Sequence, residues 1–558
     1  MRFTVESVTE GKLDQLKEYA LAISVFDKRD SFDSRFDPIV RVEAGRLRNR
    51  LRQYYENEGR DDAVIIDLPK GSYVPRFVSA GTNRENPLRE GTGKTQSYSA
   101  NSIAVLPFAD HSPGADQEYF CDGMTEELIN ALTKLRGLRV AALNSALQMR
   151  GKADDYRKVA EQLKVGSIVA GSVRKAGNRL RITVQLIDTS NGCYLWSEIY
   201  DRQIEDVFAI QEDISQAIVA KLKVQIADGQ SSHLVRRYTG NFDAYTLYLK
   251  GRYCWNQRSE QSLRKAVEFF EQALALDPRY VPAFSGLADS YALLGNSGAE
   301  PPKSVKAKAM EAALKAVELD ATLAEAHTTL GHVRATYCWD WPGACTEYKL
   351  AMALNPAYAT VHHWYAITYL SPLGLFENAR TEIEKAEELD PLSASIKRDI
   401  AVILYNGRLY EQAIEQCKKT IELEPAFQSS YWALGLAYGG VSQYDEAVSA
   451  FQHALTRSVS HTPRFLGALG HVYARWGKQA EASKVLEEMN ELSKTRYVSP
   501  FDFAMIHLGF GNSDTAFEWL ERACKARCYE LVFLKVDPRF DSVRSDLRFT
   551  RLLKRLGL

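Results

Sequence analysis

The sequence predicts a multidomain protein in which a small N-terminal domain and a central α/β domain precede a long all-α superhelix. Three observations lead to this fold class. The chain has 558 residues, more than one hydrophobic core usually holds. Residues 79–101 are rich in Gly, Ser, Thr, Asn and Arg and have almost nothing to bury, which is typical of a flexible linker. From residue 241 to 558 one helical pattern returns with a period of about 34 residues.

The composition excludes several classes of function for the chain as a whole. Its 70 Lys and Arg residues balance 71 Asp and Glu residues, so any binding of nucleic acid or an anionic membrane must be local. The eight cysteines form no Cys-x-x-Cys pair, and the nearest two, Cys524 and Cys528, have no His or Cys beside them to complete a metal site. We find no signal peptide and no run of about 20 apolar residues, so we expect no membrane span and a cytoplasmic location.

The N-terminal domain contains an unusually basic helix. Five of the 16 residues from Val40 to Tyr55 are arginines. Apolar residues recur there at spacings of three and four, which predicts one stripe facing a core. The members of this stripe are Val40, Ala44, Leu47, Leu51 and Tyr54.

The segments around this helix predict a helix before it and a hairpin after it. Residues 14–26 are amphipathic, and Asp37 with Pro38 would begin the basic helix. Residues 63–77 alternate as a hairpin does and turn near Lys70 and Gly71.

This order of helices and hairpin, with the turn sequence KGSY and the closing Phe77, resembles the DNA-binding domain of OmpR-like response regulators and CadC-like activators. The resemblance implies a winged helix-turn-helix in residues 1–78. It implies that the basic helix enters the major groove or contacts the flanking phosphates, and that the hairpin serves as the wing. The residues so assigned to DNA binding are Arg41, Arg46, Arg48, Asn49, Arg50, Arg52, Lys70 and Arg76.

Two features of residues 1–78 depart from that family. The segment has 14 basic and 14 acidic residues, so phosphate neutralisation would add only modest affinity. The family's leading strands and first helix are missing or cut short, so we expect the domain to be truncated at its N-terminus. The alternative is that the arginines form a solvated face that pairs with Glu43, Glu56 and the aspartates of residues 27–37.

The linker contains the sequence GTGKT at 91–95, which is similar to the end of a phosphate-binding loop. That loop needs a glycine where this chain has Leu88, and it needs a strand before it and a helix after it. Neither is predicted here. We therefore expect no nucleotide site and no other cofactor.

Residues 102–225 predict the α/β domain. Apolar runs predict buried strands, helical periodicity predicts helices, and the Asn-Gly and Gly-Asn turns predict hairpins. The predicted elements are a strand at 102–108, a helix at 121–135, a strand at 138–143, an Asp-capped helix at 154–163, three antiparallel strands joined by the turns KAGNR and TSNGC, and a helix at 207–222.

The stretches SIAVLPF, YFCDGMTEELINAL, GSVRKAGNRLRITVQLID and LWSEIYDR resemble the domain related to the N-terminal part of TolB. In many bacterial proteins that domain stands ahead of tetratricopeptide repeats and behind a cyclase, kinase or DNA-binding module. The resemblance implies a sensory or assembly role and supplies no catalytic residues.

An acidic run, Asp110, Asp116, Asp122 and Glu126, is the one cluster in this domain that could hold a cation. Capping and the helix dipole explain acidic residues at a helix start more simply. The chain also has no Ser-His-Asp order, no HExxH motif and no glycine-rich phosphate turn. We expect no enzyme activity and no metal site.

The C-terminal half repeats a helix pair. Successive copies close at Pro278, Ala321, Pro356, Pro391 and Pro425, which are 43, 35, 35 and 34 residues apart. This period predicts tetratricopeptide repeats. The insert GNSGAEPPK, expected to be a loop, accounts for the longer first interval, and the closing segment from LVFLKVDP onward is expected to cap the stack.

Such repeats form a superhelix with a concave groove, which predicts a bound protein or peptide. Gly286 and Ala288 would let the first helix of one pair pack closely against its partner. Tyr248, His362 and His363 could line the groove, although a Tyr or His on a packing helix is more often a core residue.

The sequence as a whole predicts a bacterial regulator. Its repeats would bind a protein or peptide and thereby change DNA binding by the N-terminal winged helix, with homodimerisation left open. The alternative is a non-catalytic interaction scaffold of the adenylate-cyclase-associated type without DNA binding.

Overall fold

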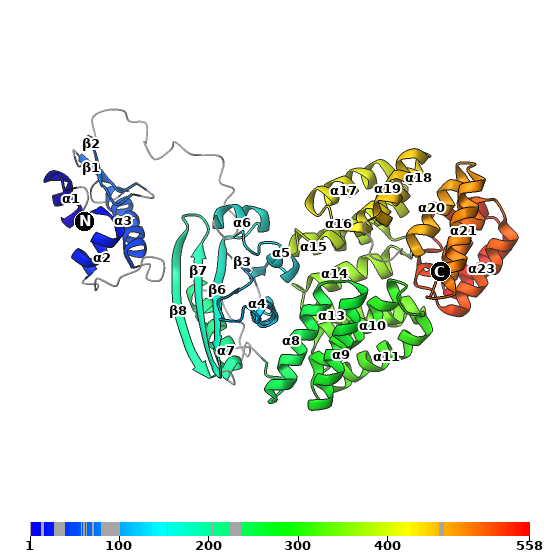
Figure 1. The fold of residues 1–558 in the computed structure, drawn as a ribbon, viewed down its shortest axis with the longest axis horizontal. Helices are drawn as coiled ribbons and strands as arrows, with labels where there is room; N and C mark the ends of the chain where they lie inside the picture. Colours follow the sequence, from blue (N-terminus) through cyan, green and yellow to red (C-terminus); the bar gives the residue numbers. More distant parts are fainter. Residues whose placement is uncertain are drawn as a thin grey trace. The chain divides into compact units, whose positions relative to one another are not determined.

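The computed structural model forms two compact units, residues 1–98 with 187–196 and residues 99–186 with 197–558; each is considered by itself (Figure 1). The described residues are 2–12, 16–26, 39–56, 59, 62, 64–69, 72–79, 101–135, 137–152, 155–203, 206–222, 236–456 and 463–558.

The N-terminal part of the first unit consists of three helices and a hairpin. Its elements are α1 (Arg2–Thr9), α2 (Glu18–Phe26), α3 (Ile39–Glu56), β1 (Val64–Asp67) and β2 (Arg76–Ser79). The two strands pair antiparallel, with Val64 opposite Ser79 and Asp67 opposite Arg76. A small core of Leu16, Leu21 and Ala22 packs against the start of α3.

The apolar stripe predicted for α3 is right at its N-terminal end and wrong at its C-terminal end. Val40 and Ala44 are buried, Leu47 and Leu51 are half-buried, and Tyr54 is 42% exposed. The core of this unit is too short to reach the last turns of the 18-residue helix. The predicted start of the helix, Asp37 and Pro38, lies outside the described residues.

The α/β domain is built on a mixed sheet with the order β5-β3-β6-β7-β8, and β4 also pairs with β6. The strands are β3 (Ser102–Val105), β4 (Ala109–Asp110), β5 (Arg139–Val140), β6 (Ser167–Ala176), β7 (Arg179–Asp188) and β8 (Cys193–Gln203). The helices are α4 (Glu118–Thr133), α5 (Leu143–Leu147), α6 (Tyr156–Leu163) and α7 (Val207–Leu222).

The strands predicted for the central sheet are present, but β3 and β5 are shorter than the predicted ranges 102–108 and 138–143, and β4 was not predicted. All four residues of β3 are buried, and β3 pairs in parallel with both β5 and β6. Tight turns join β6 to β7 and β7 to β8, so these neighbouring strands run antiparallel. The predicted cap of α6 is Asp155, whose carboxylate accepts a hydrogen bond from the Arg157 backbone N–H at 3.1 Å.

The C-terminal region is predominantly helical and resembles tetratricopeptide-repeat superhelices, with helices that pair in sequence order. The elements are α8 (Phe242–Asn256), α9 (Glu260–Leu276), α10 (Val281–Asn296), α11 (Pro302–Leu319), α12 (Ala324–Val333), η3 (Arg334–Cys338), α13 (Trp341–Leu354), α14 (Ala359–Tyr365), η4 (Ala366–Leu370), α15 (Phe376–Leu389), α16 (Ala394–Asn406), α17 (Tyr410–Leu423), α18 (Gln428–Gly440), α19 (Tyr444–Thr456), α20 (Pro463–Arg475), α21 (Gln479–Ser493), α22 (Pro500–Gly509), α23 (Ser513–Ala526), η5 (Tyr529–Phe533), η6 (Pro538–Val543) and α24 (Leu547–Leu556). The insert at 295–303 is only partly a loop, because α10 runs to Asn296 and α11 starts at Pro302.

Glycines let the helices of neighbouring pairs approach one aromatic ring. A Cβ at Gly251 in α8 or at Gly286 in α10 would lie 2.5 Å from the ring of Phe270 in α9. Gly435 in α18 makes the same approach to Phe451 in α19. The predicted role of Gly286 in close helix packing is therefore confirmed.

Within the second unit several hydrogen bonds join the α/β domain to the repeats, and two buried carboxylates are among the acceptors. Glu126 of α4 accepts a hydrogen bond from Arg252 Nε of α8 at 2.9 Å. Asp390, which follows α15, accepts hydrogen bonds from the Ser145 backbone N–H at 2.9 Å and from Asn144 Nδ2 at 3.0 Å. Directional bonds to buried carboxylates hold the domain in one orientation on these helices.

The segment after α23 does more than cover the end of the stack. Its apolar residues pack on α22 and α23, as a cap would. It also returns to helices 189 and 215 residues earlier: Arg527 donates to the Cys338 carbonyl at 3.4 Å, and Trp341 Nε1 donates to the Leu556 carbonyl at 2.7 Å. Further along, Arg408 donates to the Val536 carbonyl at 2.8 Å. The sequence predicted only a cap, because helix periodicity does not reveal which distant surface a non-periodic segment covers.

Candidate functional site

The predicted DNA-binding arginines have different surroundings. Arg48 is half-buried, and its guanidinium donates three hydrogen bonds to backbone carbonyls of the hairpin: Leu68 at 2.8 Å, Pro69 at 3.2 Å and Ser72 at 3.0 Å. It thus fixes the hairpin to α3 and has few donors left for a ligand. The groove or phosphate contact that the resemblance implies for Arg48 stays a prediction.

Two further arginines of α3 form ion pairs at the surface. Arg41 Nε lies 2.9 Å from Glu18 Oε1, and Arg46 Nη1 lies 2.5 Å from Glu43 Oε1. All four side chains reach solvent. Exposed pairs of this kind contribute little to stability, so another anion can replace the carboxylate beside each arginine.

The remaining predicted residues are either exposed or undescribed. Arg50 on α3 and Arg76 on β2 are exposed. The side chains of Asn49, Arg52 and Lys70 lie outside the described residues. The assignment of this surface to DNA thus stays a prediction.

The acidic run of the α/β domain is divided among separate partners. Asp110 accepts hydrogen bonds from the backbone N–H groups of Ser112 and Gln117, both at 2.8 Å, just before α4. Asp122 is paired with Arg150, and Glu126 with Arg252. Arginine pairing, and not the helix dipole alone, accounts for these last two carboxylates. Over the described part of the chain, no three His, Cys, Asp or Glu side chains group as a metal site would.

Tyr248, His362 and His363 are buried in the repeats. His362 Nδ1 lies 2.6 Å from Glu382 Oε2, and His363 Nε2 lies 2.7 Å from Asp399 Oδ2. Both histidines form hydrogen bonds to carboxylates on neighbouring helices. This confirms the interpretation of these side chains as core residues.

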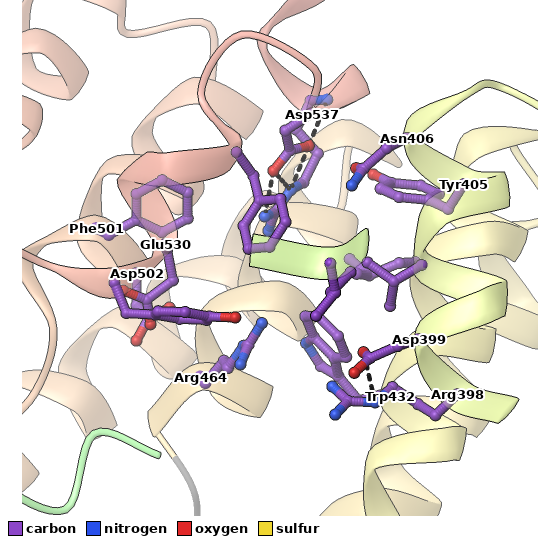
Figure 2. Close-up of a pocket in the computed structure, with 16 residues that line it drawn as sticks. Arg398, Asp399, Tyr405, Asn406, Trp432, Arg464, Phe501, Asp502, Glu530 and Asp537 are labelled. Atoms are coloured by element: carbon purple, nitrogen blue, oxygen red, sulfur yellow. Dashed lines mark hydrogen bonds and ion pairs between the residues drawn. The ribbon is translucent and has the colours of Figure 1, made fainter. Parts of the chain in front are cut away.

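A cavity of about 70 Å³ lies among the first helices of the later repeats and the returning C-terminal segment (Figure 2). Its walls come from η4, α16, α18, α20 and α22 on the repeat side and from η5 and the start of η6 on the other. Its charged lining residues are Arg398, Asp399, Arg464, Asp502, Glu530, Asp537 and Arg539.

Some of these charges are already paired. Arg539 Nη2 lies 2.6 Å from Asp537 Oδ2, and Arg398 Nε lies 3.1 Å from Asp399 Oδ1. Burial disfavours ionisation of Asp399, but the charge of Arg398 and the hydrogen bond with His363 keep the pKa of Asp399 below its ordinary value. These pairs form the fixed part of the cavity wall.

Other polar groups of the cavity have no such partner. Asp502 and Glu530 are 4% and 9% exposed, and burial together with the Glu530 carboxylate raises the pKa of Asp502. The guanidinium of Arg464 stacks on the Trp432 ring, 4.1 Å from its centre. Within the described part of the chain, Asn406 Nδ2 and Trp432 Nε1 are buried donors without an acceptor.

Sequence reasoning missed this cavity because its residues come from seven elements between 367 and 539. One available signal is a carboxylate inside an apolar helix, as Asp502 is in PFDFAMIHLG. That signal identifies one unusual residue, but only the tertiary structure brings Arg464 and Glu530 beside it.

Comparison with known families identifies two parts of the chain. Residues 99–221 match the family described as HilA/YgeH-like transcriptional regulator, second domain, and residues 428–458 match the tetratricopeptide repeat. The chain thus holds a HilA/YgeH-like regulator domain followed by tetratricopeptide repeats. The resemblances to TolB and to OmpR- or CadC-like winged helices stay predictions.

Two curated relatives show similarity over longer stretches. "Putative adenylate cyclase 3" of Rhizobium meliloti (strain 1021) is 33% identical over 285 residues, 49% of this chain and 48% of the relative. "Transcriptional regulator HilA" of Salmonella typhimurium (strain LT2) is 22% identical over 340 residues, 60% of this chain and 58% of the relative. The chain therefore spans about half the length of these relatives.

Among solved structures, a tetratricopeptide repeat protein from Parabacteroides merdae aligns with 48% of this chain and 100% of its own, at 12% identity and a TM-score of 0.35. The Cut9–Hcn1 hetero-tetramer of the APC/C aligns with 57% of this chain and 54% of its own, at 16% identity and a TM-score of 0.37. No helix in the described ranges is at once long enough and apolar enough to cross a bilayer.

Proposed function

We propose that this protein is a transcription regulator whose N-terminal unit binds DNA through α3 and the β1–β2 hairpin. The observation that carries the proposal is the HilA/YgeH-like regulator domain at 99–221, which follows a unit of three helices and a hairpin with exposed arginines. The order of these elements suits a winged helix, in which a helix enters the major groove and the hairpin contacts the backbone.

Within this proposal the arginines have separate roles. Arg50 and Arg76 are exposed and would contact phosphate or base edges. Arg41 and Arg46 would exchange their surface carboxylates for phosphates. Arg48 would position the hairpin as the wing. Asn49, Arg52 and Lys70 complete the interface predicted from the sequence.

The second part of the proposed function is binding of a protein partner, which the tetratricopeptide repeats support. Binding of that partner would change the orientation or dimerisation of the DNA-binding units in the cytoplasm. A peptide against α16, α18, α20 and α22 is a weaker candidate, because residues between 529 and 539 already line the cavity that these helices form.

The test is binding of the full chain to fragmented genomic DNA across a salt titration, followed by sequencing of the retained fragments. We expect enrichment of a few sites and a linear fall of log affinity with log salt concentration. An Arg50→Glu, Arg76→Glu variant should lose this enrichment, and the slope should decrease by about 0.9 for each phosphate contact removed.

The matched control is an Arg279→Glu, Lys525→Glu variant, which makes the same change in charge at two exposed positions of the repeats. It should bind as the unchanged protein does. If the unchanged chain retains no specific fragments, or if both variants lose binding equally, the DNA-binding proposal is wrong.

A second candidate function is a non-catalytic scaffold of the adenylate-cyclase-associated type, without DNA binding. The observation that favours it is the 33% identity with "Putative adenylate cyclase 3" over 285 residues. Failure of DNA binding together with co-purification of a cyclase would support this candidate. Conversion of ATP to cyclic AMP by the purified chain would contradict its non-catalytic character.

A further inference from the structure

The cavity among the later repeats is bounded by the chain's own C-terminal segment. Tyr529 to Phe533 form one of its walls, and the Arg408 bond to the Val536 carbonyl holds this segment against α16. A second bond joins Arg408 Nη2 to Asp541 Oδ1 at 2.7 Å. With the segment so held, the remaining space of about 70 Å³ suits a small molecule better than a peptide.

One part of the cavity wall offers hydrogen-bond donors. Asn406 is 3% exposed and Trp432 is 5% exposed, and both line the cavity with a donor that has no acceptor in the described residues. A buried donor without an acceptor costs folding free energy, so such groups usually meet a ligand or water. Arg464, stacked on Trp432, adds a positive charge and makes no ion pair with any described carboxylate.

Another part of the wall offers negative charge. Asp502 and Glu530 lie together on one side of the cavity, and Arg464 lies between them and Asp399 in Figure 2. The only hydrogen bond recorded for their carboxylates within the described chain is a long one, from Ser499 Oγ to Glu530 Oε2 at 3.5 Å. Two buried carboxylates side by side repel each other unless a cation or a proton comes between them.

A ligand of one charge leaves part of this wall uncompensated. An anion alone would satisfy Arg464 and the Trp432 N–H, but Asp502 and Glu530 would then have to share a proton. A cation alone would satisfy the carboxylates but would leave the two donors without an acceptor. A molecule with both a carboxylate and an ammonium group satisfies both parts.

We propose that this cavity binds a small polar amino acid. Its carboxylate lies against the Arg464 guanidinium and Trp432 Nε1, and its ammonium group lies between Asp502 and Glu530. Asn406 Nδ2 donates to the side chain of the ligand. Because the cavity wall includes both the repeats and the C-terminal segment, the bound amino acid contacts both and stabilises the packing of one against the other.

The test uses the full chain without DNA, so its outcome is independent of the proposed DNA binding. Thermal unfolding is measured with each of the 20 L-amino acids at 5 mM, and any amino acid that raises the midpoint is titrated by calorimetry. We expect at least one small polar amino acid to raise the midpoint by about 2–4 °C. Its methyl ester and its N-acetyl derivative, which each lack one charge, should have no such effect.

Two variants locate the site. Asp502→Asn keeps the shape of the side chain and removes its charge, and Arg464→Met removes the guanidinium; each should weaken binding at least tenfold. Arg475→Gln, at an exposed position of the same helix α20, should bind the amino acid normally. The proposal is overturned if no amino acid raises the midpoint, if either derivative binds as well as the amino acid, or if Asp502→Asn binds as tightly as the unchanged chain.

Discussion

The indole Nε1 of Trp341 donates a hydrogen bond to the carbonyl oxygen of Leu556 at 2.7 Å, although 215 residues separate them in the sequence. Trp341 is the first residue of α13 and Leu556 the last of α24. This bond joins the middle of the repeat region to the end of the chain.

We expect Trp341→Phe to lower the free energy of unfolding by about 1–3 kcal/mol, because it leaves the buried Leu556 carbonyl without a donor. Urea denaturation measures this loss. Trp339→Phe is the control, since the Trp339 N–H has no partner among the described residues. Equal losses in the two variants would show that the hydrogen bond to Leu556 does not stabilise the fold.

Asp390 should be required for docking of the α/β domain. Its carboxylate accepts from the Ser145 N–H and from Asn144, and Ser145 Oγ in turn accepts from the Leu392 N–H at 2.8 Å. We expect Asp390→Ala to cost about 3 kcal/mol and to make the domain junction susceptible to protease. Asp277→Ala, at the corresponding helix end of an earlier repeat, should cost much less. Equal protease resistance in both variants would contradict this role.

Gly286→Ala should destabilise the first repeats by about 1–3 kcal/mol, because its Cβ would lie 2.5 Å from the Phe270 ring. Adding Phe270→Leu to this variant should recover part of the lost stability, because the smaller side chain leaves room for the new Cβ. Gly439→Ala in α18 meets only Val472, at 3.4 Å, and should be close to neutral. Thermal unfolding of the three variants checks the order, and a neutral Gly286→Ala would mean that the ring moves aside at no cost.

The protein should lose stability on mild acidification through His471. Burial and the charge of Arg539 lower the pKa of His471 to about 4, although its Nδ1–H bonds to the Met505 carbonyl at 2.7 Å. The ordinary pKa of histidine is about 6.5, so the unfolded chain takes up a proton first. The stabilisation is present above pH 6.5 and is lost as the pH falls toward 4, by at most about 3 kcal/mol.

The measurement is the free energy of unfolding from pH 7 to pH 4 for the unchanged chain and for His471→Gln. The variant should show a smaller fall over this range. His453→Gln, at an exposed position of α19, serves as the control. Parallel curves for the unchanged chain and His471→Gln would show that another group causes the acid sensitivity.

Arg48 and Arg50 should differ although they are two residues apart on α3. Arg48→Ala removes three hydrogen bonds to the hairpin and should destabilise the first unit by about 2 kcal/mol. Arg50→Ala removes an exposed side chain and should leave the stability of the unit unchanged. Hydrogen exchange of peptides covering β1 and β2 should be faster in Arg48→Ala alone; unchanged exchange would mean that the hairpin does not depend on this contact.

Local patterns in the sequence predicted the elements of the second unit well. Strand β3 is a short apolar run, Asp155 caps α6, and Gly286 allows close packing, because each depends on neighbours within one helix pair or one strand. The predicted apolar stripe of α3 is wrong at Tyr54, which is exposed. Periodicity shows which residues share a face of a helix, but it does not show how far the opposing core extends.

By itself, the sequence determined the helical repeats, the central sheet and the position of the basic helix, since periodicity, turn chemistry and composition act over short distances along the chain. Only the tertiary structure decided that Arg48 fixes the hairpin, that the last residues return to Trp341 and Arg408, and that Arg464, Asp502 and Glu530 share one cavity. These contacts join segments up to 215 residues apart. Such pairings depend on which surfaces meet when the layers pack, and no local pattern specifies that.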